Sequence, residues 1–315
     1  MIRVAAVDLG TNSTRLLVAD VEGEQLSEVV RRLTITRLGE GVDSRRRLLP
    51  LPVARVRGCL AEYRREIESH GVDRTLAIAT SAVRDADNGE AFLGEIEWSY
   101  GFTTLLLDGA AEASMMARGV AAGRGALEHT LIVDIGGGST ELVECGADGE
   151  VVSSASIDAG CVRGTERFIE SDPPTPGELA SAAAAVRTLL PSSNATSAIG
   201  VAGTITTLAA LDLGLVEYDP ERTHGYRIAR AAVGEQLERL AGMTLAERLR
   251  VPGIEPGRAP VIVAGLVILG EILDAYALNE IEASERDILH GAALTAAALP
   301  AREEGPAPPG AYTSC

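Results

Sequence analysis

The sequence is poor in aromatic residues and in cysteine. Aromatic side chains make up 3% of the 315 residues, so the cores must be built from Ala, Val, Leu and Ile. With 46% hydrophobic residues the composition is that of a globular protein and excludes a disordered chain. The four cysteines show neither a C-x-x-C motif nor the spacing of a disulfide framework. We therefore expect a reducing compartment, the cytoplasm.

The chain also lacks a long apolar run and a leader segment. Its most apolar stretch, residues 261–269, is far too short to span a bilayer. The N-terminus begins directly with a strand-like run and has no basic region, apolar segment and cleavage site in succession. We expect neither a membrane span nor a secretory signal.

Positive charge is scarce. The 28 basic residues are outnumbered by 45 acidic ones, which gives a net charge of −17. Such a charge argues against non-specific binding to nucleic acid or to an anionic membrane. A phosphate-bearing ligand would have to be held by a local cluster of N–H groups, arginines and metal ions against this field. The alternative is that the acidic charge only keeps the protein soluble.

Several catalytic motifs are absent. The sequence has no G-x-x-x-x-G-K-[ST] loop, no H-E-x-x-H and no G-x-S-x-G, and its four histidines show no metal-ligand spacing. A nucleophilic triad and zinc-dependent hydrolysis are therefore unsupported.

One short pattern occurs twice. Residues 7–18 read V-D-L-G-T-N-S-T-R-L-L-V and residues 133–143 read V-D-I-G-G-G-S-T-E-L-V, so that Asp8 aligns with Asp134. Each copy predicts a strand–turn–strand hairpin. Turn glycines let the backbone approach an anion, and successive N–H groups form an anion-binding concavity. The predicted phosphate-binding residues of the two turns are Gly10, Thr11, Asn12, Ser13, Gly136, Gly137, Gly138 and Ser139. For either copy alone, the Asp and Gly residues could be present only because they are common in turns.

The two copies differ at one informative position. Arg15 stands in the first copy where Glu141 stands in the second. The cation, Arg15, fits a phosphate clamp on one wall of a cleft. The carboxylate, Glu141, fits a ligand for a metal or for water on the opposite wall.

Three further segments have phosphate-compatible chemistry. Residues 79–85 place the hydroxyls of Thr80 and Ser81 at a strand end, with Arg84 one helical turn later. The Gly203-Thr204 pair follows a predicted strand at a helix start, and Glu112 lies in the first turn of another helix. Each also has a purely structural explanation. Residues 79–85 could be an N-capped helix with a solvated arginine, and Gly203-Thr204 could be a turn that is common in α/β proteins. Glu112 could simply occupy a position that the helix dipole favours.

The order of predicted elements indicates an α/β protein with two domains. Strands are predicted at 2–8, 15–20, 74–80, 105–107, 130–134, 141–145, 151–157 and 198–201, and helices at 53–69, 111–122, 177–190 and from 205. We place the domains at 1–124 and 125–300, leave open whether the last helix, near 286–299, returns to the first domain, and expect a disordered tail at 301–315.

As a set, these motifs resemble those of the exopolyphosphatase and guanosine pentaphosphate phosphohydrolase (Ppx/GppA) family. The resemblance lies in residues 7–13, 79–85, 109–113, 133–141 and 203–204. Residues 160–167, G-C-V-R-G-T-E-R, and residues 284–289, S-E-R-D-I-L, add to it. It covers nearly all of residues 1–299, and the length matches the short, two-domain members. It implies an actin-like fold, as in sugar kinases and heat-shock ATPases, with duplicated ribonuclease H-like domains around a cleft.

The resemblance also implies roles for individual residues. Glu112 matches the general base for water, and Arg84 matches the arginine at the phosphate. Asp134 and Glu141 match the carboxylates linked to a divalent cation, Mg²⁺ or another, and Asp8 is a further candidate ligand. Three positions depart from the family pattern: Asp108, Ala111 and Pro260 stand where a serine, a glutamate and an aspartate are usual.

The sequence thus predicts metal-assisted hydrolysis of terminal phosphoanhydride bonds of inorganic polyphosphate, which releases orthophosphate. Hydrolysis of guanosine pentaphosphate at the same site and a catalytically weak sensor of phosphate or nucleotide remain alternatives. A kinase is disfavoured, because no sugar site is evident. We expect no nucleic-acid or membrane partner and leave a homodimer open.

Overall fold

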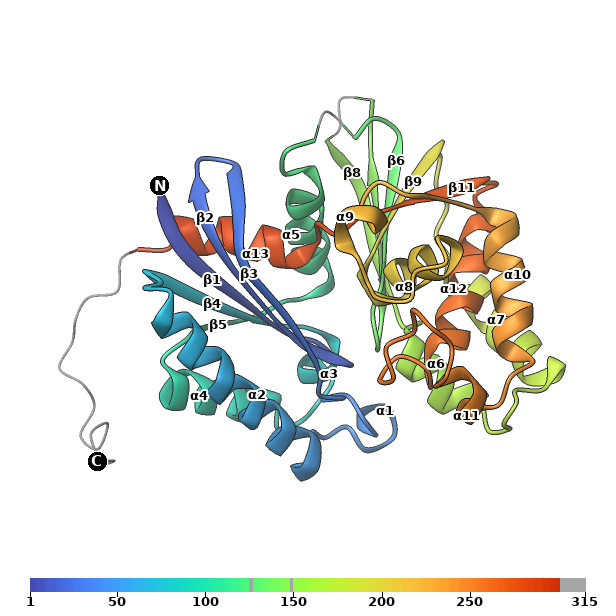
Figure 1. Cartoon of the computed structure of the whole chain (residues 1–315), viewed down its shortest axis with the longest axis horizontal. Coiled ribbons are helices and arrows are strands. Elements are labelled where there is room, and N and C mark those ends of the chain that lie inside the picture. Colours follow the sequence, from blue (N-terminus) through green and yellow to red (C-terminus); the bar gives the residue numbers. More distant parts are fainter. Residues whose placement is uncertain (125–126, 148–149, 301–315) are drawn as a thin grey trace.

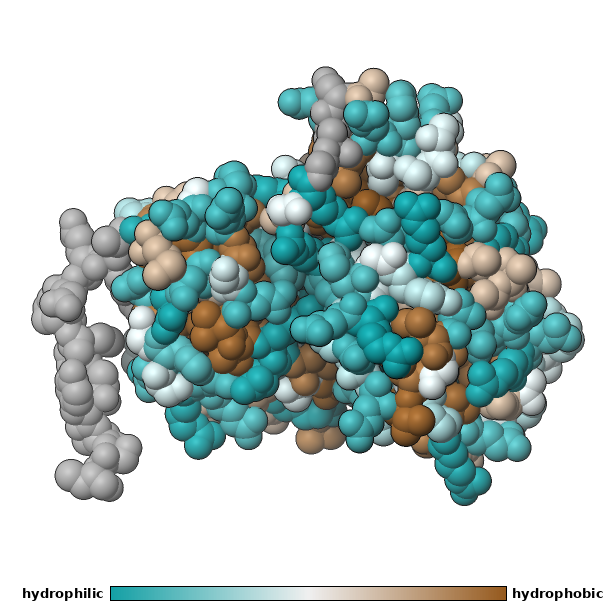
Figure 2. Space-filling model, turned by 45° about the horizontal axis from the view of Figure 1, so that its top comes forward, coloured by the Kyte–Doolittle hydropathy of each residue, from teal (hydrophilic) through white to brown (hydrophobic). Residues whose placement is uncertain are grey.

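The structure, a computed structural model, describes residues 1–124, 127–147 and 150–300 and contains two units, each built on its own sheet (Figure 1). The boundary predicted after residue 124 adjoins residues 125–126, and the predicted tail 301–315 also lies outside the described residues. The face in Figure 2 is mostly hydrophilic, with hydrophobic residues in separate patches.

The first sheet has the strand order β3-β2-β1-β4-β5, with β1 antiparallel to β2 and parallel to β4. Its strands are β1 (Ile2–Leu9), β2 (Ser13–Glu22), β3 (Gln25–Ile35), β4 (Arg74–Ala79) and β5 (Thr103–Leu106). One face packs on α2 (Pro50–Ser69) and α4 (Gly89–Tyr100), which share a core with the strands. Two single-turn helices, α1 (Val42–Arg45) and α3 (Ser81–Arg84), lie near the ends of strands β3 and β4.

The second sheet repeats this arrangement. Its order, β10-β11-β9-β6-β7-β8, has β6 in the place of β1, with β7 antiparallel on one side and β9 parallel on the other. Its strands are β6 (Thr130–Ile135), β7 (Thr140–Cys145), β8 (Val151–Ile157), β9 (Ser197–Val201), β10 (Arg227–Ala229) and β11 (Glu280–Ala283). The predicted α/β fold with duplicated ribonuclease H-like sheets is confirmed.

The helices of the second unit pack on this sheet and on each other. They are α6 (Cys161–Phe168), α7 (Pro176–Leu189), α8 (Ala202–Asp212), α9 (Pro220–Thr223), α10 (Arg230–Ala241), α11 (Leu245–Arg248) and α12 (Ile262–Ala275). The apolar stretch 261–269 belongs to α12, which is buried against α7 and α10. The helix α7 begins at a capping box formed by Thr175 and Glu178. Among the described helices none is long and apolar enough to cross a membrane.

Two helices lie between the sheets and join the units. The last helix, α13 (Ile288–Ala298), packs on β1, β2 and β4, whereas α5 (Gly109–Ala121) packs on β7 and β8 of the second sheet (Figure 1). They cross closely: a Cβ on Gly119 would lie 1.9 Å from the Asp287 carbonyl oxygen, and one on Gly291 would lie 1.9 Å from that of Met115. Glycine is therefore required at both positions. The buried side chains of both helices share one core with strands of both sheets.

Candidate active site

A cleft of about 660 Å³ lies between the two units. Both hairpin turns, the N-termini of α3 and α8 and the first turn of α5 contribute to it. Of the predicted site residues, those that line the cleft are Asp8, Gly10, Thr11, Asn12, Ser13, Arg15, Thr80, Ser81, Glu112, Asp134, Gly136, Gly137, Ser139, Glu141, Gly203 and Thr204. The two that do not are Arg84 and Gly138.

In the second hairpin loop (residues 136–139), backbone N–H groups at the start of α6 donate hydrogen bonds to two of the carbonyl groups. The Gly136 carbonyl accepts from Cys161 N (2.9 Å), and the Gly137 carbonyl accepts from Val162 N (2.9 Å) and Arg163 N (3.0 Å) at the start of α6. The N–H groups of Gly137, Gly138 and Ser139 have no acceptor among the described residues. In a trans peptide unit the C=O and N–H point in opposite directions, so these three N–H groups face away from α6. Successive outward N–H groups of this kind are the donors that anion-binding loops use.

The first hairpin loop (residues 10–13) is built the same way. The Asn12 carbonyl accepts from Thr36 N (3.1 Å) and Arg37 N (2.9 Å), and the Thr11 carbonyl accepts from Gly39 N (2.8 Å). The two loops meet at the floor of the cleft, where a Cβ on Gly137 would come within 2.8 Å of Thr11 Cβ. Both turns therefore have the backbone geometry that the repeated pattern predicts.

Three carboxylates crowd the wall formed by the second unit and α5. Asp134 of β6 lies directly opposite Glu141 of β7, and Glu112 lies in the first turn of α5. All three are less than 10% exposed. Burial and the neighbouring Glu141 raise the pKa of Glu112 to about 9. Burial also raises the pKa of Asp134 and of Glu141. The Ser156 hydroxyl donates to Glu141 at 2.8 Å, which only partly compensates its charge.

The equivalent pair on the first hairpin is an ion pair. Arg15 donates to one oxygen of Asp8 from Nε (2.8 Å) and Nη2 (2.6 Å), and its Nη1 contacts Asp287. The guanidinium predicted as a phosphate clamp is thus already held between two buried carboxylates. The other oxygen of Asp8, Oδ1, is buried and has no hydrogen-bond partner within the part of the chain that the structure describes.

Arg84 acts on Glu112 rather than on the cleft. Its Nη1 donates to the Leu107 carbonyl at 2.8 Å and to Glu112 Oε2 at 3.1 Å. This contact holds the pKa of Glu112 below the value that burial alone would give. The structure therefore pairs the predicted base with the predicted phosphate-binding arginine.

The donor set fits a hard cation. The described residues contain no cluster of three or more His, Cys, Asp or Glu side chains arranged as a metal site. However, the raised pKa values of Asp134 and Glu141 indicate that no counter-ion fully offsets the burial of these two carboxylates. Asp8 is already neutralised by Arg15, but its Oδ1 has no hydrogen-bond partner among the described residues. Mg²⁺ is commonly held by one or two carboxylates together with substrate oxygens, and these residues suit that arrangement.

The departures from the family pattern leave this wall intact. Asp108 is the N-cap of α5 and accepts from Ala111 N at 2.8 Å, so it begins the helix that carries Glu112. Pro260 lies in a turn before α12.

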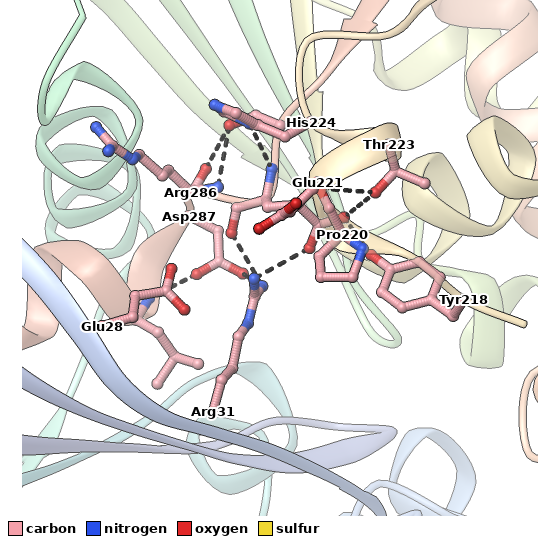
Figure 3. A network of polar contacts seen from close by, with 12 residues as sticks. Glu28, Arg31, Tyr218, Pro220, Glu221, Thr223, His224, Arg286 and Asp287 are labelled. Carbon is pink, nitrogen blue, oxygen red and sulfur yellow. Dashed lines mark hydrogen bonds and ion pairs between the residues drawn. The ribbon is translucent and has the colours of Figure 1, made fainter.

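Sequence reasoning missed one polar network at the cleft edge (Figure 3). Arg31 of β3 pairs with Glu285 at 3.0 Å and lies 3.9 Å from Asp287. Glu285 also accepts from the hydroxyls of Tyr218 and Thr223. In Figure 3, Arg31 points from the first sheet toward Asp287, and Tyr218 and Thr223 approach from the second unit. The charged run S-E-R-D at 284–287 is the sequence feature that could have indicated this network.

Three exposed apolar side chains also line the cleft. Leu33, Val216 and Tyr218 line it and are 39%, 76% and 49% exposed. Exposed apolar side chains at a cleft are typical of a binding site for a partly apolar ligand.

Known proteins resemble this chain in sequence and in fold. The sequence matches the Ppx/GppA phosphatase family over residues 17–297. It is 39% identical to exopolyphosphatase 2 of Mycobacterium tuberculosis (strain H37Rv), over 94% of this chain and 98% of that protein. The crystal structure of an exopolyphosphatase-like protein superposes with a TM-score of 0.86 at 34% identity, covering 92% of this chain and 97% of the other. The Ppx/GppA enzyme of Aquifex aeolicus superposes with a TM-score of 0.79 at 31% identity, covering 93% and 99%. The chain belongs to the Ppx/GppA phosphatase family.

Proposed function

We propose that this protein is an exopolyphosphatase, which hydrolyses the terminal phosphoanhydride bond of inorganic polyphosphate and releases orthophosphate. The observation that carries the proposal is the placement of a buried glutamate, Glu112, beside two hairpin loops with outward N–H groups and a pair of uncompensated carboxylates.

Each group has a role in phosphoryl transfer to water. The loop N–H groups bind the terminal phosphate oxygens, and the hydroxyls of Thr11 and Ser81 complete that contact. Glu112 takes a proton from the attacking water. It must be deprotonated to do so, and its raised pKa then makes the carboxylate a stronger base. Asp134 and Glu141, with Asp8 as a further ligand, would hold Mg²⁺, which supplies charge neutralisation for the phosphate oxygens.

A direct assay tests the proposal. Orthophosphate release from polyphosphate is measured for the purified chain with Mg²⁺ and with EDTA, and Glu112→Gln is the inactive control. Mg²⁺-dependent release that the variant lacks supports the proposal. Release that is equal in both proteins assigns the activity to a contaminant or to another site.

A second substrate, guanosine pentaphosphate, is favoured by the exposed apolar side chains that line the cleft. Polyphosphate has no apolar part that could cover Leu33, Val216 and Tyr218, whereas a nucleobase does. We propose Tyr218→Ala as the discriminating variant. It should raise KM for guanosine pentaphosphate but not for tripolyphosphate. An equal effect on both substrates would mean that these apolar side chains do not recognise a nucleobase.

Location in the cytoplasm and a homodimer stay predictions.

A further inference from the structure

Arg163 of α6 joins the two units beneath the cleft. It is 8% exposed. Its Nε donates to the Gly138 carbonyl at 2.6 Å, its Nη2 to Asp85 at 2.6 Å and its Nη1 to Asp43 at 2.9 Å. A single guanidinium therefore connects the second hairpin loop with α1 and with the C-terminal end of α3.

Gly138 lies against both the first hairpin loop and α3. A Cβ there would lie 2.7 Å from Ser81 Oγ and 3.3 Å from Thr11 Oγ1, and those two hydroxyls are 2.9 Å apart. Because Arg163 holds the Gly138 carbonyl, the Ser139 N–H of the same peptide unit is directed away from α6. The bond to Asp85 fixes α3 itself, since Asp85 is the residue that ends this helix.

We propose that Arg163 is a positioning residue that holds the second hairpin loop and α3 so that Ser139 N–H and the Ser81 hydroxyl face the same bound phosphate. The inference rests on the proposed function, because it assigns a role within that site. Arg163 does not line the cleft, so it acts through Gly138 and Asp85. A guanidinium suits the task because its donors point in fixed directions, whereas a lysine ammonium is a single point charge.

The competing explanation is that Arg163 only ties the units together. The neighbouring Arg167 separates the two explanations. Its Nε donates to Asp43 at 2.6 Å, so it also makes an ion pair between the units, but it has no bond to the loop or to Asp85. Arg167→Gln is therefore the matched control.

The experiment compares Arg163→Lys, Arg163→Gln and Arg167→Gln with the wild type in the full chain with Mg²⁺. Thermal unfolding, kcat and KM for tripolyphosphate are measured. We expect Arg163→Lys to unfold near the temperature of Arg167→Gln, because it keeps a positive charge between Asp43 and Asp85. Its kcat should fall by on the order of 10²-fold with a much smaller change in KM, since a displaced loop misaligns the reacting phosphate. Arg167→Gln should keep the wild-type kcat.

Two results would overturn the inference: wild-type kcat in folded Arg163→Lys, or an equal loss of kcat in Arg167→Gln. If the Arg163 variants do not fold, Asp85→Asn replaces them, and wild-type kcat in that folded variant has the same meaning. A wild type that is inactive on every phosphorylated substrate would refute the proposed function instead. Calorimetric affinity for tripolyphosphate then decides: weaker binding by Arg163→Lys than by Arg167→Gln supports the positioning role, and equal binding refutes it.

Discussion

Asp134 and Glu141 face each other across β6 and β7, in the register that Asp8 and Arg15 occupy across β1 and β2. Side chains directly opposite on antiparallel strands lie on the same face of the sheet, close enough to interact. The first hairpin thus contains its own counter-ion, and the second lacks one. The repeat has therefore diverged into one wall that is internally neutralised and another that requires an external cation or a proton.

This difference predicts the effect of Asp134→Asn. The amide is a poorer ligand for a hard cation, so the Mg²⁺ concentration for half-maximal activity should rise. In EDTA the same variant should unfold at a higher temperature than the wild type, because one of two facing buried carboxylates becomes neutral. An unchanged Mg²⁺ titration with a lower unfolding temperature would mean that Asp134 only shapes its turn.

Replacing Glu112 by Gln removes the proton acceptor and leaves the shape of the site. We expect kcat to fall by about 10²–10⁴-fold. Substrate affinity, measured by calorimetry on the inactive variant, should stay close to that of the wild type. A variant with normal kcat would exclude Glu112 as the base.

The raised pKa of Glu112 also makes stability depend on pH. In the unfolded chain a glutamate has a pKa of about 4.3, whereas in the folded chain that of Glu112 is about 9. The folded state therefore binds more protons between these values, and the free energy of unfolding should decrease as pH rises from about 5 to 9. Urea titrations of wild type and Glu112→Gln without divalent cations test this. The variant should show the shallower decrease, and parallel curves would argue against the shift.

Arg84→Met should move the pH profile of activity. Arg84 lowers the pKa of Glu112 through a hydrogen bond and its charge, so its removal should raise that pKa further. The acidic limb of kcat against pH should shift to higher pH, since the base must lose its proton to act. If Arg84 instead contacts only the substrate, KM will rise and the acidic limb will not move.

Arg15→Met should be strongly destabilising. It leaves Asp8 buried without its cation and removes from Asp287 the nearer of its two arginines, since Arg31 lies 3.9 Å away. Breaking a buried pair in this way typically costs about 3–5 kcal/mol. The exposed pair of Arg57 with Glu95 is the control, and Arg57→Met should cost at most about 1 kcal/mol. Urea unfolding measures both, and similar losses would contradict the assignment.

The parts of the site that could be predicted from the sequence are local. The hairpins follow from an apolar run on either side of a turn rich in glycine and hydroxyl residues. The bonds that hold the loop carbonyls come from residues 36–39 and 161–163, which the repeated pattern does not indicate. The carboxylate positions follow from the strand register, which the repeat made visible.

The parts that could not be predicted depend on distant partners. Arg15 was expected at a phosphate, but its contact Asp287 lies at the opposite end of the chain. Arg84 was expected at the cleft, yet its bond to Glu112 depends on how α5 packs beside α3. No local pattern indicates that α5 packs on the second sheet while α13 packs on the first.

The position of α13 has a consequence for how the protein is made. This helix covers β1, β2 and β4, but it is synthesised more than 200 residues after β4, because it spans Ile288–Ala298 and β4 ends at Ala79. A growing chain on the ribosome therefore exposes an apolar face of its first sheet until residues 288–298 have been synthesised. Exposed apolar surface of this kind invites aggregation and chaperone binding. Protease digestion of ribosome-stalled chains should find the first unit sensitive until residues 288–298 have emerged.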